Sequence, residues 1–235
     1  MTVTAVPSAD ERYRDEYFVV QQAKSDAKVA WEYDRLLAMG NVRLDPGAVV
    51  LDGACGAAPG LRYFTGRVRS AVGVDIATAA LRAAREMLPS APLVQADLDA
   101  PLPFRERSFD AIILREAIEH VLDGERTLRF CLRVLRPGGV VALTTPNRWD
   151  VRRPIDAATR QTWCGDADPT HTHIYAPGEM RRVLHRAGFD RVRVRTGFKP
   201  VIRIGGKRLS RRIDVPYPPL IGNGVVAFGW REGDA

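Results

Sequence analysis

The strongest constraint on the fold is an apolar strand that ends abruptly in small residues. The run Val49–Leu51 leads into Asp52-Gly53-Ala54-Cys55-Gly56, and Gly60 follows shortly after. This order predicts a buried parallel strand, a tight turn and the first turn of a helix. Because glycine has no side chain, a ligand can lie directly against the backbone of such a turn. The turn is therefore the predicted centre of a binding site.

A second predicted strand ends in an acid, at a characteristic sequence distance from the glycine turn. The run Ala71–Ile76 is apolar except for Asp75, which lies about 20 residues beyond the turn, where a doubly wound fold places the acid that binds ribose hydroxyls. The turn lacks the Gly-x-Gly-x-x-Gly order typical of NAD binding. The two strands together predict a site for a ribose-bearing ligand other than NAD.

Three consecutive predicted strands end in aspartate. Asp52 and Asp75 are joined by Asp97, which closes the run Leu93–Asp97. In an open parallel sheet the ligand lies outside the carboxyl ends of the strands. Three acids at that edge would repel a pyrophosphate, so the pattern favours a neutral or cationic nucleoside.

Several motifs together resemble one family. The turn is similar to the Asp-x-Gly-x-Gly signature of class I S-adenosylmethionine (SAM) dependent methyltransferases, with Ala54 where glycine is commoner. Further along, Ser108–Leu114, Glu119-His120 and Arg133–Gly139 resemble the ubiquinone-biosynthesis-like, small-molecule branch. The resemblance runs from about residue 49 to residue 147.

The resemblance implies a fold, a cofactor and a set of contacts. The fold would be α/β, a doubly wound, mostly parallel sheet of seven strands with the last strand antiparallel. SAM would be the cofactor, with Asp75 at the ribose and Asp97 at the adenine amino group. The implied cofactor-binding residues are Asp52, Gly53, Ala54, Gly56, Asp75, Ile76, Asp97, Leu98 and Arg115.

We expect one methyltransferase domain over residues 1–235, with three additions. A helical lid is expected over 1–40, as one helix from Asp10 to Met39 ended by Gly40, and a basic loop over 199–222. The irregular stretch 148–175 follows the fifth predicted strand, so it is the predicted substrate cap. The candidate substrate-binding residues are Tyr13, Tyr17, His120, Trp163 and Tyr175.

The cap also carries the candidate general base. Methyl transfer from SAM requires an aligned nucleophile and removal of its proton, a task that suits histidine near neutral pH. His171 is the first choice and His173 the second, since both would lie on one face of an extended segment. A hydroxyl is the expected acceptor, with an amine less favoured. A divalent metal held by Asp166, Asp168, His171 and His173 is a competing interpretation.

Composition leaves three functional classes open. The net charge is +7, and a basic run without an acid comprises Lys199, Arg203, Lys207, Arg208, Arg211 and Arg212. This run makes a nucleic-acid methyltransferase the alternative to a small-molecule enzyme acting on a sugar or secondary metabolite. The unusual turn keeps a non-catalytic SAM-binding subunit as the third class.

The remaining composition argues for a cytoplasmic protein. No signal-peptide pattern and no bilayer-length apolar run occurs in the sequence. The three cysteines are widely spaced, which argues against a disulfide framework or a thiolate metal site. We expect a monomer or homodimer with a small-molecule partner and neither a membrane nor a nucleic acid.

Overall fold

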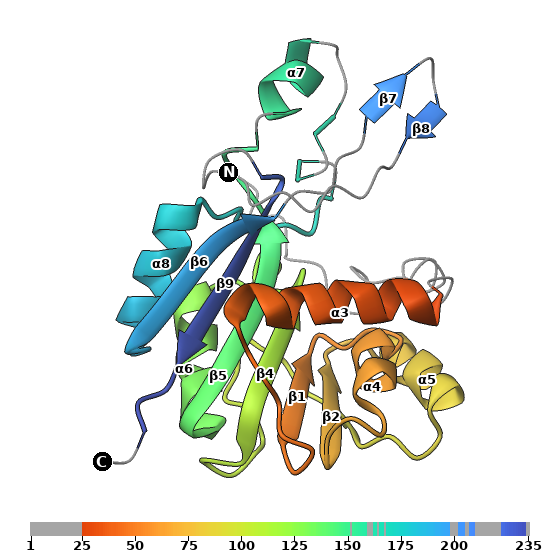
Figure 1. Ribbon diagram of the computed structural model, residues 1–235, viewed down its shortest axis with the longest axis vertical. Helices are drawn as coiled ribbons and strands as arrows, with labels where there is room; N and C mark the ends of the chain where they lie inside the picture. The colour runs from red at the N-terminus through yellow and green to blue at the C-terminus, as the bar shows by residue number, and fades with distance from the viewer. Residues whose placement is uncertain are drawn as a thin grey trace, which may run out of the picture.

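The protein is built on one mixed sheet of seven strands (Figure 1). The computed structural model describes residues 25–150, 152–158, 162–163, 165–166, 168–197, 202–204, 207–209 and 222–233. The sheet order is β3-β2-β1-β4-β5-β9-β6. Its strands are β1 (Val49–Gly53), β2 (Ser70–Asp75), β3 (Leu93–Gln95), β4 (Phe109–Arg115), β5 (Leu135–Pro146), β6 (Arg191–Gly197) and β9 (Gly224–Trp230).

Strand direction confirms the predicted fold class. Strands β1 to β5 pair in parallel, whereas β9 lies between β5 and β6 and runs antiparallel to both. The last strand in the chain is therefore the reversed one, as the resemblance implied. This arrangement brings the carboxyl ends of β1, β2, β4 and β5 to one edge of the sheet (Figure 1).

Alternating side chains divide the core into two layers. Along β4, Ile112 and Leu114 join one cluster, while Ala111 and Ile113 join the other. The first cluster includes residues of α6 (Gly124–Val134) and α8 (Pro177–Arg186), and the second includes residues of α3 (Asp26–Gly40) and α4 (Pro59–Phe64). A further helix, α5 (Thr78–Met87), contacts β2 and β3. Burial on both faces explains why β4 reads as a continuous apolar run.

The lid helix differs in detail from its expected form. Residues 10–24 of the predicted helix lie outside the described residues, and α3 begins at Asp26 with Ser25 as its N-cap. Gly40 remains helical, and Asn41 takes the left-handed conformation that ends the helix. A Cβ atom on Gly40 would lie 2.4 Å from the Phe228 ring, so close packing against β9 requires glycine there.

The predicted end of the third strand was wrong, and two stretches expected to be irregular contain short elements. The third strand ends at Gln95, because pairing with β2 stops where Asp75 meets Gln95, and Asp97 lies in the following loop. The cap is not wholly irregular, since α7 (Arg152–Ala158) lies within it. The basic stretch contains two short antiparallel strands, β7 (Ile202–Ile204) and β8 (Lys207–Leu209). Among the described residues, no helix is apolar over a length that would cross a bilayer.

Candidate active site

The glycine turn between β1 and α4 contains three left-handed residues, Ala54, Gly56 and Ala58. Ala54 has φ of 55° and Gly56 has φ of 53°, so alanine occupies a conformation that normally favours glycine. Gly60, on the first turn of α4, packs directly against the carboxylate of Asp52. A Cβ atom there would lie 2.2 Å from Asp52 Oδ2 and 2.3 Å from the Tyr33 hydroxyl. The turn is thus folded tightly around the acid that ends β1.

Asp75 holds this turn to the neighbouring strand. Its Oδ2 accepts a hydrogen bond from the Gly56 backbone at 2.9 Å, and its Oδ1 accepts one from Ala77 at 3.0 Å. Burial raises the pKa of the carboxyl, although these backbone hydrogen bonds oppose the rise. Asp75 therefore orders the turn as well as presenting a carboxylate beside it.

Asp52 is a buried acid with an unsatisfied oxygen. The residue is only 2% exposed, and Oδ2 makes no hydrogen bond with the described part of the protein. Burial raises its pKa to about 7, Arg115 lowers it and Asp75 raises it further. A buried oxygen without a partner is costly, so Asp52 is set up to receive a donor from a ligand.

Arg115, at the end of β4, points toward α3. Its guanidinium lies 4.6 Å from the centre of the Tyr33 ring and donates to Glu32 Oε2 at 2.6 Å. Glu32 and Tyr33 both belong to α3, so this contact fixes the helix over the carboxyl edge. Burial and the nearby Asp52 raise the pKa of the Tyr33 hydroxyl. No pattern in the sequence indicated these partners, because they depend on how α3 crosses the sheet.

The remaining expected cofactor contacts lie at the same edge. Gly53 has no room for a side chain, since a Cβ atom would lie 2.5 Å from Leu114. Ile76 directly follows β2 and is half-buried, and Leu98 is buried in the loop after β3. Asp97 is exposed, and its Oδ1 accepts from the Asp99 backbone.

The aromatic residues expected to bind substrate are buried. Trp163 is 2% exposed and its Nε1 donates to Asp150 Oδ2 at 2.9 Å, while Tyr175 packs in the core. Tyr13 and Tyr17 lie outside the described residues. An unexpected residue, Trp149, is half-exposed on the segment that leaves β5. No sequence pattern distinguished it from Trp163.

The two candidate bases have different surroundings. His173 Nε2 lies 2.8 Å from Glu179 Oε1, and Glu179 also accepts from Arg148. His173 is thus part of an ion-pair network at the start of α8. His171 Nδ1 instead lies 2.6 Å from the carbonyl oxygen of Gly165. Because a carbonyl only accepts, this contact assigns the proton to Nδ1 and leaves Nε2 to accept in the neutral ring.

His171 belongs to a cluster that joins the segment after residue 168 to the loop after β4. One carboxylate oxygen of Glu119 and one ring nitrogen each of His120 and His171 lie within 4.8 Å of one another. The segment is held here by Thr172, whose backbone and hydroxyl both donate to the Glu119 carbonyl. Glu119 was not expected as a site residue. Its signal in the sequence is an acid within the apolar run Ala117–Val121.

Glu119, the acid of this cluster, is fully buried. It is 0% exposed, and neither carboxylate oxygen makes a hydrogen bond of acceptable geometry with a described residue, although Thr145 lies close enough to favour its charged form. Burial, and secondarily the charge of Glu116, raises the pKa of Glu119 well above its usual range. Burial also lowers the pKa of His120.

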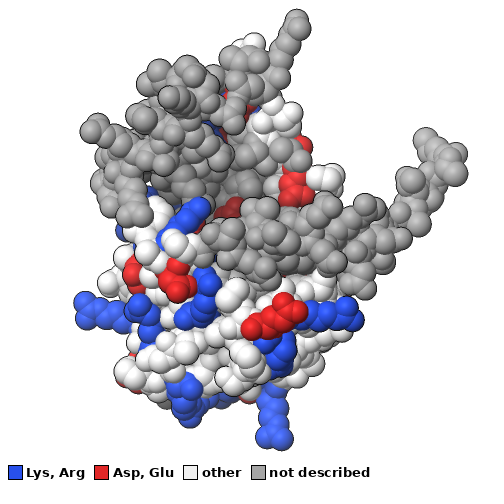
Figure 2. All heavy atoms as spheres, turned by 90° about the vertical axis from the view of Figure 1, so that its right-hand side faces the viewer, with Lys and Arg blue, Asp and Glu red and all other residues white. Residues whose placement is uncertain are grey.

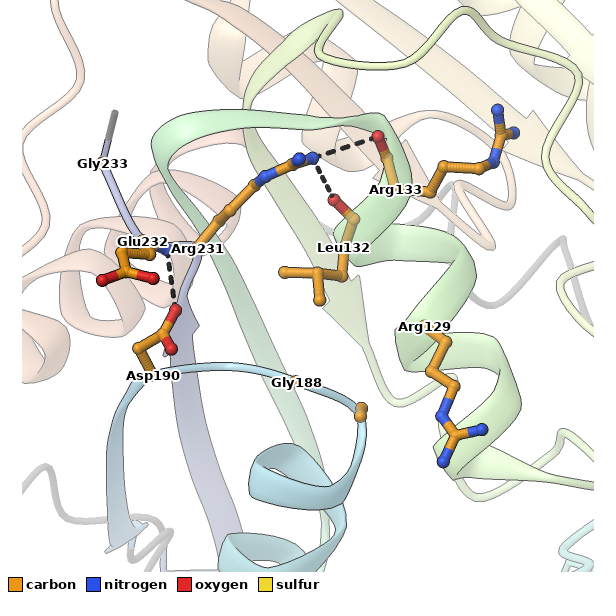
Figure 3. Close-up of a pocket in the computed structure, with 9 residues that line it drawn as sticks. Arg129, Leu132, Arg133, Gly188, Asp190, Arg231, Glu232 and Gly233 are labelled. Carbon is orange, nitrogen blue, oxygen red and sulfur yellow. Dashed lines mark hydrogen bonds between the residues drawn. The ribbon is translucent and has the colours of Figure 1, made fainter. Parts of the chain in front are cut away.

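A separate pocket of about 550 Å³ lies at the opposite, amino edge of the sheet (Figure 3). Two of its charged side chains, Arg231 and Asp190, are already engaged. Arg231 donates to the carbonyls of Leu132, Arg133 and Leu135, and Asp190 accepts from the Glu232 backbone. The Arg231 side chain therefore caps the carboxyl end of α6.

The fold and the carboxyl edge define a nucleoside-binding α/β protein of the Rossmann-like class, because a glycine turn and an acid on the next strand meet there. Residues 51–143 match the family model described as a methyltransferase domain. A solved SAM-dependent methyltransferase from Archaeoglobus fulgidus covers 92% of this chain and 99% of its own, with a TM-score of 0.67 and 16% identity.

Two sequence relatives add the family. A ubiquinone biosynthesis O-methyltransferase from Chromobacterium violaceum is 30% identical over 170 residues, which is 67% of this chain and 72% of that protein. A probable SAM-dependent methyltransferase from Mycolicibacterium smegmatis is 31% identical over 144 residues, or 61% of this chain. That match spans only about half, 52%, of the relative's length. The chain belongs to the class I SAM-dependent methyltransferases, and SAM is its cofactor.

Proposed function

We propose that this protein transfers the methyl group of SAM to a nucleophilic hydroxyl or amino group of a small molecule, such as a sugar or secondary metabolite. Asp75 would bind the ribose hydroxyls, and the unsatisfied Oδ2 of Asp52 would face the methionine end of SAM. Residues 148–175 would form the acceptor cap. The observation that carries the proposal is the cluster of His171 with Glu119 beside this edge.

His171 would act as the general base. Its Nδ1 hydrogen bond to Gly165 leaves Nε2 able to take a proton, whereas His173 is engaged with Glu179. SAM supplies an electrophilic methyl group on a sulfonium, so the side chains need only align the nucleophile and accept its proton. His171 is therefore the stronger of the two candidates.

A transfer assay with labelled SAM tests this role. The substrates would be a library of hydroxylated and amino-bearing small molecules. We expect His171→Ala to lower turnover about 100-fold or more, as for loss of a general base, and His173→Ala to lower it less than about tenfold. Equal losses in the two variants, with cofactor binding intact, would contradict the assignment of the base.

A small-molecule acceptor is supported over a nucleic acid by charge distribution. On the face shown in Figure 2, the Lys and Arg side chains of the described residues are spread among acids rather than gathered in one patch. Continuous basic surfaces are typical of nucleic-acid binding. Retention of methyl-transfer activity in high salt would agree with this proposal.

Metal-assisted transfer to a hydroxyl is the second candidate, with different ligands from those first expected. Asp166 faces Arg153 and His173 faces Glu179, so the expected set does not converge. Glu119, His120 and His171 do converge, and two imidazoles with one carboxylate suit a divalent ion. Such an ion would lower the pKa of a bound hydroxyl. Metal content after dialysis, and turnover with and without EDTA, test this candidate.

A further inference from the structure

The cluster of Glu119, His120 and His171 offers hydrogen-bond acceptors to a cation: two ring nitrogens, and the carboxylate that Glu119 forms when a positive charge lies beside it. The assignment of Nδ1–H in His171 follows from its carbonyl partner, as above. His120 Nδ1 lies 2.9 Å from the Thr170 hydroxyl, which donates its own proton to Asp168. His120 Nδ1 must then be the donor in that contact. In both neutral rings Nε2 is therefore the accepting nitrogen.

The charges around the cluster have one sign. The acids Glu116 and Asp168 act on Glu119 and raise its pKa, and Asp168 also faces His171 across 3.9 Å. The Asp168 carboxylate accepts hydrogen bonds from the backbone and the hydroxyl of Thr170. These bonds lower the pKa of Asp168, so it stays charged. A group that enters here meets negative charge and lone pairs.

We propose that this cluster binds the primary amino group of the methyl acceptor, so that the acceptor is an amine. A primary ammonium has three N–H donors, which match one carboxylate oxygen and two ring nitrogens. Acceptors placed about 2.8–2.9 Å from one ammonium nitrogen stand about 4.6–4.7 Å apart, close to the observed limit of 4.8 Å. This inference rests on the proposed methyltransferase function and decides the element that is methylated.

A hydroxyl acceptor fits the same site poorly when no metal is bound. It has one donor for two ring nitrogens, and the negative charge that develops on its oxygen would be repelled by Asp168. A divalent ion would reverse this preference, but ligands about 2.1 Å from a metal stand closer to one another than 4.8 Å. The cluster would have to contract around an ion, whereas an ammonium needs no such movement.

The chemistry of the amine step balances. The bound ammonium gives one proton to His171 Nε2, which forms the imidazolium and leaves a neutral amine with a lone pair. That lone pair attacks the methyl carbon of SAM, so that an N–C bond forms and the S–C bond breaks. The electron pair of the S–C bond stays on sulfur, giving S-adenosylhomocysteine and a secondary ammonium. The positive charge of the bound ammonium opposes the rise in the pKa of Glu119, so that the carboxyl releases its proton to solvent as the cation binds and the carboxylate then stabilises the positive charge.

The histidine side chains allow a direct test that does not require the natural acceptor. The chain has only four histidines, so their ring nitrogens can be followed individually by NMR. The probes are benzylamine and benzyl alcohol, a matched pair, each titrated into the full chain saturated with S-adenosylhomocysteine. We expect saturable shifts of the His120 and His171 Nε2 signals with benzylamine, unchanged signals with benzyl alcohol, and an unmoved His185.

Two substitutions of one kind sharpen the test. Glu119→Gln keeps the shape of the side chain and removes its charge, so it should weaken the benzylamine response about tenfold or more. Glu116→Gln removes an exposed acid three residues away and should change the response less than about threefold. Both variants should still bind S-adenosylhomocysteine. Equal responses in the two variants would show that no specific ammonium site exists.

Manganese separates the competing occupant. If submillimolar MnCl₂ broadens the His120 and His171 signals while benzylamine leaves them unmoved, the cluster is a metal site and the amine proposal is overturned. Benzyl alcohol giving the same saturable shifts as benzylamine would overturn it too. Loss of S-adenosylhomocysteine binding in the unmodified protein would instead contradict the proposed function itself, so the two failures are distinguishable.

Discussion

Charged side chains lie at both edges of the sheet, but they differ in how far their hydrogen-bonding atoms are satisfied. At the amino edge, Arg231 caps three carbonyl groups at the end of α6 (Figure 3). At the carboxyl edge, Asp52 and Glu119 are buried with oxygens that make no hydrogen bond to the described residues. A satisfied polar group stabilises the fold, whereas an unsatisfied one costs stability until a ligand arrives. The unsatisfied edge is therefore the functional one.

The largest expected effect is at Asp75. Asp75→Ala removes the acceptor of the Gly56 and Ala77 backbone groups and the proposed ribose contact together. We expect the dissociation constant of S-adenosylhomocysteine to rise at least about 100-fold in calorimetric titration. Asp97→Ala, at the expected adenine contact, should have a smaller effect, below about tenfold, because Asp97 is exposed and its carboxylate accepts from the Asp99 backbone within the same loop.

The next largest effect is on stability at the other edge. Arg231→Met removes three hydrogen bonds to the end of α6 and should lower the free energy of unfolding by about 2–3 kcal/mol, measured with urea. Cofactor affinity should not change. Arg129→Met removes a largely exposed pair with Glu125 and should cost less than about 1 kcal/mol. A loss of cofactor affinity in Arg231→Met would contradict the assignment of ligand binding to the carboxyl edge alone.

A smaller, pH-dependent effect is expected at Asp52. Its folded pKa of about 7 lies above that of an unfolded aspartate, so the protonated folded state is favoured at low pH and this contribution is lost as the pH rises through about 7. Asp52→Asn cannot ionise. Its free energy of unfolding relative to the unmodified protein should therefore increase between pH 5 and pH 8, by about 1–3 kcal/mol. A constant difference over that range would mean that Asp52 does not titrate there.

The smallest effect concerns the turn itself. Ala54 has φ of 55°, a conformation that costs alanine more than glycine. Ala54→Gly should raise the free energy of unfolding by up to about 1 kcal/mol, because relief of strain is partly offset by the greater freedom of glycine when unfolded. Ala83→Gly within α5 should instead lower it by about 1 kcal/mol. Thermal unfolding of the two variants tests whether their changes in the free energy of unfolding have opposite signs.

Local patterns predicted the edge of the sheet but not the cluster beneath the cap. Asp75 could be recognised because its strand is an apolar run at a fixed distance from the glycine turn. Glu119 and His171 lie far apart in the sequence, and they meet because Thr172 bonds to the Glu119 carbonyl. Such contacts follow no helical or strand period, so sequence reasoning chose His171 without its partners. The same limit explains the end of β3, where pairing with β2 rather than residue type stops the strand.

The position of β9 has a consequence for how the protein is made. Its neighbours β5 and β6 both precede it in the chain, yet each pairs with β9 and not with the other. During synthesis, one edge of β5 must therefore stay unpaired until residues 224–230 have left the ribosome. The side chains along this edge are largely apolar. An open apolar edge of this kind invites pairing between chains. The slow step in obtaining this protein in native form should accordingly be the insertion of a single strand between two waiting ones, and shielding by a chaperone should matter most in that interval.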